Sequence, residues 1–110
     1  MAFDTLEYLK KGGRIGRAQA FMGSILKVHP ILTLKDGELY PVARERSRPK
    51  AIDHLYNFAM SFSHIDEMAV EDATTPDEAE MLIERLSFIR CGSMLYGHLV
   101  NMGKAHGKVI

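Results

Sequence analysis

The spacing of hydrophobic residues predicts an alternation of short helices and short strands. Leu6 and Leu9 share one face of a helix that we expect to begin at a capping-box-like pair, Asp4 and Glu7. This helix should stop near Lys11, because the Gly12-Gly13 pair that follows can take the positive φ found at helix ends. Apolar residues at helical spacing then predict a second helix over residues 18–28, closed by Pro30.

A β-hairpin is predicted next. Residues 31–34 have the composition of a strand, and Asp36-Gly37 is a strong two-residue turn signal. Residues 38–43 then form the partner strand, so we expect one antiparallel pair.

The second half of the chain predicts two more helices and two more strands. Pro49 near a helix start precedes a wide apolar stripe from Ala51 to Phe62, which indicates a central helix. A short strand is expected at Met68–Val70. Thr75 as N-cap before Pro76 predicts a helix that ends near Cys91-Gly92, and residues 94–100 suit another strand. The expected fold is a single α+β domain over residues 1–110, with helices packed on an antiparallel or mixed sheet.

Composition narrows the class of protein. The chain has 110 residues, of which 46% are hydrophobic and 25% charged, as is typical of a globular domain. The sequence contains no long uncharged apolar run and no amino-terminal secretion signal, so we expect a cytoplasmic protein without stable membrane insertion. Cys91 is the one cysteine, which excludes an internal disulfide.

The sequence gives no independent case for catalysis. Its histidines and carboxylates lack metal-ligand spacing, so we expect no metal and no cofactor. Nucleophile elbows, phosphate loops and dinucleotide fingerprints are missing, which favours a non-enzymatic protein.

Charge is unevenly distributed although the net charge is zero. Residues 1–55 carry ten basic and six acidic side chains, and residues 56–110 carry four basic and eight acidic ones. This division disfavours general nucleic-acid binding and suits a protein with one basic docking edge. The densest basic cluster contains Arg44, Arg46, Arg48 and Lys50.

Several motifs together resemble the DegV family of bacterial fatty-acid-binding proteins. They are DTLEYLKKGGRIG at residues 4–16, MGSIL at 22–26, HPIL at 29–32, the DGE turn at 36–38 with Pro41-Val42, the basic segment 44–51, and TTPDEAE at 74–80. Their order and spacing match the carboxy-terminal domain of that family over about residues 4–86. Two departures accompany the match: family members are much longer, with an amino-terminal α/β domain, and their glycine-rich motif with a histidine is shifted and shortened in GKAHGKVI at 103–110.

The resemblance implies a site for a long-chain fatty acid. Arg14, in a glycine-rich turn before a helix start, and His106 would contact the ligand's carboxylate, and a planar guanidinium suits that role. An apolar tunnel for the acyl tail would be lined by residues from several elements: Ile15, Phe21, Met22, Ile25, Leu32, Leu55 and Phe58. Arg44, Arg46 and Arg48 would dock a fatty acid kinase, which phosphorylates the carboxylate that the carrier presents.

An alternative from another class stays open. The same domain, without its usual companion domain, could be an interaction module that binds no lipid and covers its exposed inter-domain face with a second copy. A third reading, nucleic-acid binding through residues 44–50, is disfavoured by the neutral net charge.

Overall fold

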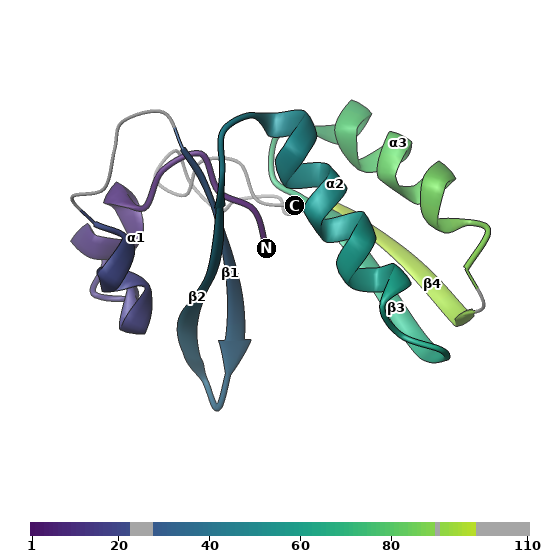
Figure 1. The fold of residues 1–110 in the computed structure, drawn as a ribbon, viewed down its shortest axis with the longest axis horizontal. Coiled ribbons are helices and arrows are strands. Elements are labelled where there is room, and N and C mark those ends of the chain that lie inside the picture. The colour runs from purple at the N-terminus through teal and green to yellow at the C-terminus, as the bar shows by residue number, and fades with distance from the viewer. Residues whose placement is uncertain (23–27, 90, 99–110) are drawn as a thin grey trace.

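The computed structural model describes residues 1–22, 28–89 and 91–98. Two groups of elements lie side by side (Figure 1). The hairpin group contains α1 (Glu7–Lys11), the 3₁₀ helix η1 (Gly16–Phe21), β1 (His29–Lys35) and β2 (Glu38–Glu45). The crossover group contains α2 (Arg48–Met60), β3 (Ile65–Asp72), α3 (Pro76–Leu86) and β4 (Cys91–His98).

The predicted hairpin is confirmed. β1 and β2 pair antiparallel, and the turn residues Asp36 and Gly37 both have positive φ, 52° and 76°. The register shifts between Ile31, which is paired with Ala43, and Leu32, which is paired with Pro41. On its other edge β1 receives residues 1–3, because Phe3 N donates to Pro30 O and Leu32 N donates to Met1 O.

The first helix ends where the sequence predicts, but it begins differently. Gly12 is its C-cap and Gly13 has a φ of 69°. The expected capping box is wrong: the N-cap is Leu6, which has no side-chain capping bond, and Glu7 N donates to Thr5 Oγ1 at 3.2 Å. The Asp4 carboxylate instead pairs with Arg48 and His29, which are distant in sequence.

The second predicted helix is also corrected. An α-helix was expected from residue 18, whereas η1 is a 3₁₀ helix that begins at Gly16, and Met22 after it is extended. The spacing of Ile15, Ala18 and Phe21 explains the tighter helix, because positions three apart align in a 3₁₀ helix and these three pack towards one cluster. Residues 23–27, in the remainder of the expected helix, lie outside the described part of the chain.

The crossover group is a β-α-β unit preceded by α2. Ser47 caps α2 through its side chain, which accepts a hydrogen bond from Lys50 N, and Pro49 lies in the first turn. β3 and β4 pair in parallel from Ile65 with Cys91 to Asp72 with His98, and α3 makes the connection that parallel strands require.

Three elements in this group have boundaries that differ from those expected. β3 runs from residue 65 to 72 and is longer than the predicted 68–70, because its exposed positions, such as Glu67 and Glu71, alternate with buried or half-buried ones. α3 ends at Leu86, and β4 begins at Cys91. Thr75 is the N-cap of α3, but its side chain makes no capping hydrogen bond.

The α+β class is confirmed, with strand pairs of both orientations. Within the described residues the pairs form two separate two-stranded sheets. The hairpin group has a core around Phe3, Leu6 and Leu32, and the crossover group has one around Val70, Leu82 and Leu86. A small cluster of Ala2, Ile31 and Ala51 joins the two groups. No helix in the described part is both long enough and apolar enough for a bilayer crossing.

Candidate functional site

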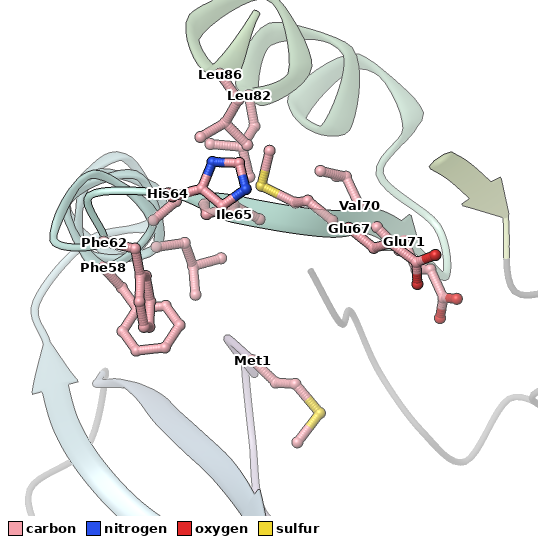
Figure 2. A pocket seen from close by; sticks show the side chains of 14 residues that line it. Met1, Phe58, Phe62, His64, Ile65, Glu67, Val70, Glu71, Leu82 and Leu86 are labelled. Carbon is pink, nitrogen blue, oxygen red and sulfur yellow. The ribbon is translucent and has the colours of Figure 1, made fainter. Parts of the chain in front are cut away.

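An apolar cavity of about 540 Å³ lies where α2, β3 and α3 meet near Met1 (Figure 2). Most of its wall is carbon, supplied by Met1, Leu55, Phe58, Ala59, Phe62, Ile65, Met68, Ala69, Val70, Leu82 and Leu86. Its volume is in the range of small-molecule sites, roughly 300 to 1,000 Å³. The cavity can therefore take a ligand of substantial apolar volume.

Helical periodicity builds two of its walls. Leu55, Phe58, Ala59 and Phe62 follow one another at i, i+3, i+4 and i+7, so α2 and the residues just after it present one continuous apolar face. Leu82 and Leu86 are four residues apart on α3 and lie on one face in the same way. β3 contributes the third wall.

Three polar side chains border the cavity. His64 precedes β3, and its Nε2 is 2.8 Å from Asp66 Oδ1. Glu67 and Glu71 are exposed positions on β3. The polar part of the lining is therefore one imidazole and two carboxylates, at positions open to solvent, which leaves the interior suited to a hydrocarbon.

A second cavity of about 70 Å³ adjoins the first. It lies between the hairpin and α2, and its lining includes Ile31, Leu32, Val42 and His54. Met1, Leu55 and Phe58 belong to both linings. These three residues therefore form the boundary that the two spaces share.

Of the residues expected to line an acyl tunnel, some line a cavity in the structure and others pack in a core. Leu55 and Phe58 line the larger cavity, and Leu32 lines the smaller one. Ile15, Phe21 and Met22 pack around Phe3, Leu6 and Ala18 in the core of the hairpin group and line neither cavity. Ile25 lies outside the described residues.

Sequence reasoning missed the wall made by β3 and α3. In the sequence, Met68 is an apolar position of a predicted strand, and Leu82 and Leu86 are apolar positions of a predicted helix, which equally describes core residues. Periodicity identifies the buried face of an element but not the gap between two elements. The i, i+4 spacing of Leu82 and Leu86 was the one available signal.

Arg14 is exposed in the turn between α1 and η1. Its backbone N–H donates to Leu9 O at 2.8 Å, which closes the turn. Within the described residues its side chain makes no hydrogen bond or ion pair, and Arg14 belongs to neither cavity lining. His106, the other expected carboxylate contact, lies outside the described residues.

The three arginines expected to dock a partner have different surroundings. Arg44 is exposed, with its guanidinium 5.0 Å from the centre of the Phe21 ring. Arg46 is exposed, and its side chain makes no hydrogen bond, ion pair or ring contact within the described part of the chain. The Arg48 side chain is only 17% exposed, and its guanidinium is ion-paired with Asp4 and Glu78.

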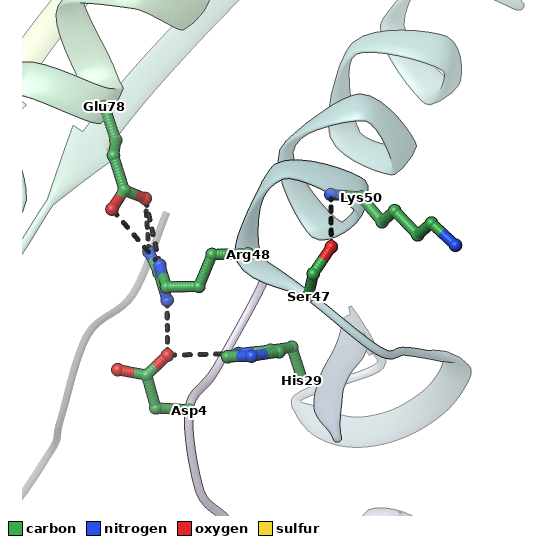
Figure 3. Close-up of polar contacts among 6 residues, drawn as sticks. All are labelled: Asp4, His29, Ser47, Arg48, Lys50 and Glu78. Atoms are coloured by element: carbon green, nitrogen blue, oxygen red, sulfur yellow. Dashed lines mark hydrogen bonds and ion pairs between the residues drawn. The ribbon is translucent and has the colours of Figure 1, made fainter. Parts of the chain in front are cut away.

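Arg48 connects three segments of the chain (Figure 3). Its Nη2 is 2.7 Å from Glu78 Oε2 on α3, and its Nη1 donates to Asp4 Oδ1 in the segment before α1. The same Asp4 oxygen is 3.3 Å from His29 Nδ1. Burial alone would lower the pKa of Arg48, but the hydrogen bonds to Glu78 and Asp4 outweigh it and raise that pKa above its ordinary value. Arg48 is thus a structural cation.

Within residues 1–22, 28–89 and 91–98, no group of three or more His, Cys, Asp or Glu side chains could hold a metal ion.

Comparison with known proteins gives consistent matches to one family. The model of the family described as "Uncharacterised protein, DegV family COG1307" matches residues 1–103. A DegV domain-containing protein of Streptomyces coelicolor is 43% identical over 86 residues, which cover 76% of this chain and 30% of that protein. Protein DegV of Bacillus subtilis is 39% identical over 93 residues, covering 76% and 31%. The chain thus spans about 30% of the length of these curated relatives.

Solved structures agree with the sequence matches. A DegV family protein from Thermus thermophilus, described by its fatty acid binding, superposes with a TM-score of 0.78 at 28% identity, over 97% of this chain and 41% of that one. A DegV family protein from Corynebacterium glutamicum has a TM-score of 0.76 at 22% identity, over 96% and 42%, which shows a shared fold.

Proposed function

The chain belongs to the DegV family, and on this premise we propose that it binds a long-chain fatty acid, with the acyl tail in the cavity of about 540 Å³. The apolar cavity is the observation that carries the proposal. The fatty acid binding of the Thermus thermophilus relative supports it, since that protein shares the fold at 28% identity.

Burial of the tail would supply most of the binding free energy. At roughly 0.8 kcal/mol for each buried methylene, a tail of about fifteen carbons could contribute on the order of 10 kcal/mol before the costs of association. Contacts to the carboxylate then mainly set the ligand's orientation. We propose Arg14 and His106 for this contact, and Arg14 in particular because its exposed guanidinium is unpaired within the described residues.

We further propose that the domain acts as a cytoplasmic, non-enzymatic carrier that offers the carboxylate to a fatty acid kinase. Arg44 and Arg46 would guide the encounter, since exposed charges at a rim act chiefly on association rate. Arg48 is left out of this set because its guanidinium is ion-paired with Asp4 and Glu78. Residues 1–110 would correspond to the tail-binding domain of the longer family members.

Titration of a fluorescent fatty acid into the folded, delipidated 110-residue chain tests the proposal. We expect saturable binding, with a fatty alcohol of equal length binding more weakly because it lacks the charge. Arg14→Ala should weaken binding of the acid by about 1.5 to 3 kcal/mol, the range for a hydrogen bond to a charged group, and leave the alcohol unaffected. Arg14→Lys should recover part of the loss.

The competing proposal is a self-associating module without lipid. Large apolar side chains that lie outside both cavity linings favour it: Met81 is 62% exposed, Leu95 68% and Phe88 92%. Native mass spectrometry separates the two proposals. Acyl mass bound to the purified chain supports the carrier, and a lipid-free dimer that rejects added fatty acid supports the module.

A further inference from the structure

Phe58 lies at the boundary between the two apolar cavities. It belongs to the lining of the larger space, with Phe62 and Met68, and to that of the smaller space, with Ile31 and Val42. Figure 2 shows its ring beside that of Phe62, a residue just after α2, with both rings on the side of Met1. The boundary is therefore made of side-chain atoms, which a substitution can remove.

Two observations single out Phe58 among the three side chains of this boundary. Leu55 is half-buried and packs against two core clusters, so it holds the fold together. Met1 is an unbranched, flexible side chain that adapts to its surroundings. Phe58 is 60% exposed, and its ring meets that of Phe62 edge to face, with centroids 5.2 Å apart and an interplanar angle of 89°. The ring is thus held in orientation without being part of the core.

We propose that Phe58 sets the length of acyl chain that the domain accepts. This inference rests on the proposed lipid binding. A tail that fills the larger cavity ends against the Phe58 ring, and the space beyond it, about 70 Å³ between the hairpin and α2, is closed to the chain. Removal of the ring joins the two spaces and admits additional methylenes.

The effect on affinity follows from the burial of hydrocarbon. Each methylene that enters the cavity should increase affinity about fourfold, until the tail reaches the boundary and further carbons stay in water. Phe58 therefore decides at which chain length this increase stops. It is a residue of specificity rather than of overall affinity.

A homologous series of saturated fatty acids, titrated by displacement of a fluorescent fatty acid, tests the proposal. In the unaltered chain affinity should rise with length and then level off. In Phe58→Ala the rise should continue to longer acids, and Phe58→Leu should lie between the two. Phe88→Ala is the matched control, because Phe88 is 92% exposed and lines neither cavity, and it should behave as the unaltered chain does.

The outcomes separate the inference from the function beneath it. An unaltered chain that binds no acid of any length overturns the proposed function together with the inference. If the unaltered chain binds, but Phe58→Ala levels off at the same length, the inference alone is overturned. Loss of all acids by both folded Phe58 variants, checked by circular dichroism, would make Phe58 a residue of general affinity and would also overturn it.

Discussion

Arg48 and Glu78, thirty positions apart in sequence, are joined by two guanidinium nitrogens: Nη2 lies 2.7 Å and Nε 3.0 Å from the same carboxylate oxygen, Oε2. The pair connects the first turn of α2 to the first turn of α3. Because Arg48 also binds Asp4, it attaches the amino-terminal segment to both helices. The group of three charges thus connects the hairpin group to the crossover group.

Arg48→Ala should therefore lower the free energy of unfolding by about 1.5 to 3 kcal/mol, because it removes the partner of the half-buried Glu78 carboxylate and leaves Asp4 with His29 alone. Arg48→Lys should restore part of the loss, since an ammonium cannot reproduce the forked contact. Urea unfolding measures both. Arg46→Ala is the control: Arg46 is exposed, and its change should stay within about 0.5 kcal/mol. Equal effects at the two positions would contradict the structural role of Arg48.

Asp72, rather than Thr75, should stabilise the start of α3. Asp72 is fully buried, and its two oxygens accept hydrogen bonds from Thr75 N and Tyr96 Oη, each at 3.0 Å. The Thr75 hydroxyl is buried and finds no partner among the described residues. Asp72→Ala should cost about 1.5 to 3 kcal/mol of unfolding free energy.

Thr75→Val is the matched comparison, because it keeps the shape of the side chain and removes the unpaired hydroxyl. It should change stability by less than about 0.5 kcal/mol or increase it. A loss near 1 kcal/mol, the usual cost of deleting a cap, would show that the hydroxyl does cap the helix.

Tyr96 should make stability depend on alkaline pH. Its hydrogen bond to Asp72, followed by burial, raises the pKa of Tyr96 above its ordinary value. A raised pKa means that the protonated phenol stabilises the fold at pH values below about 10, and that this contribution is lost as pH rises through the folded pKa. Unfolding free energy should fall between about pH 9 and pH 12, and less steeply in Tyr96→Phe.

The exposed Tyr8 provides the control for this measurement. Tyr8→Phe removes one phenol without touching Asp72, so its pH profile should follow that of the unaltered chain. A Tyr96→Phe profile that is parallel to the unaltered one over the same range would refute the linkage.

Gly16 should tolerate substitution less well than Gly13, although both have positive φ, 55° and 69°. A Cβ at Gly16 would lie 3.0 Å from the backbone oxygen of Leu39 and 3.1 Å from its nitrogen, whereas a Cβ at Gly13 meets nothing within 4 Å. Gly13→Ala should cost about 1 to 2 kcal/mol from conformation alone. Gly16→Ala should cost more in the same urea unfolding, because β2 must move as well.

Local signals predicted several elements well. The geometry of the Asp36-Gly37 turn can be predicted from its two residues, since few residue types adopt a positive φ at two successive positions. The end of α1 at Gly12-Gly13 and the start of α3 at Thr75-Pro76 depend likewise on backbone preferences of neighbouring residues. Local preference did not decide η1, where packing of Ile15, Ala18 and Phe21 at a spacing of three favoured a tighter helix.

The sequence by itself determined the α+β class, the hairpin and the family, because these follow from short-range patterns and from the order of motifs. Only the tertiary structure decided which apolar residues enclose a cavity and which fill the core. Ile15 and Phe58 are both large hydrophobic residues in the sequence. In the structure Ile15 is part of the buried core of the hairpin group, whereas Phe58 on α2 lines the cavity. It likewise decided that Arg48 is internal while Arg46 is exposed. The physical reason is the same in each case: an enclosed space or a paired charge depends on groups from segments distant in sequence, and no local pattern specifies their separation.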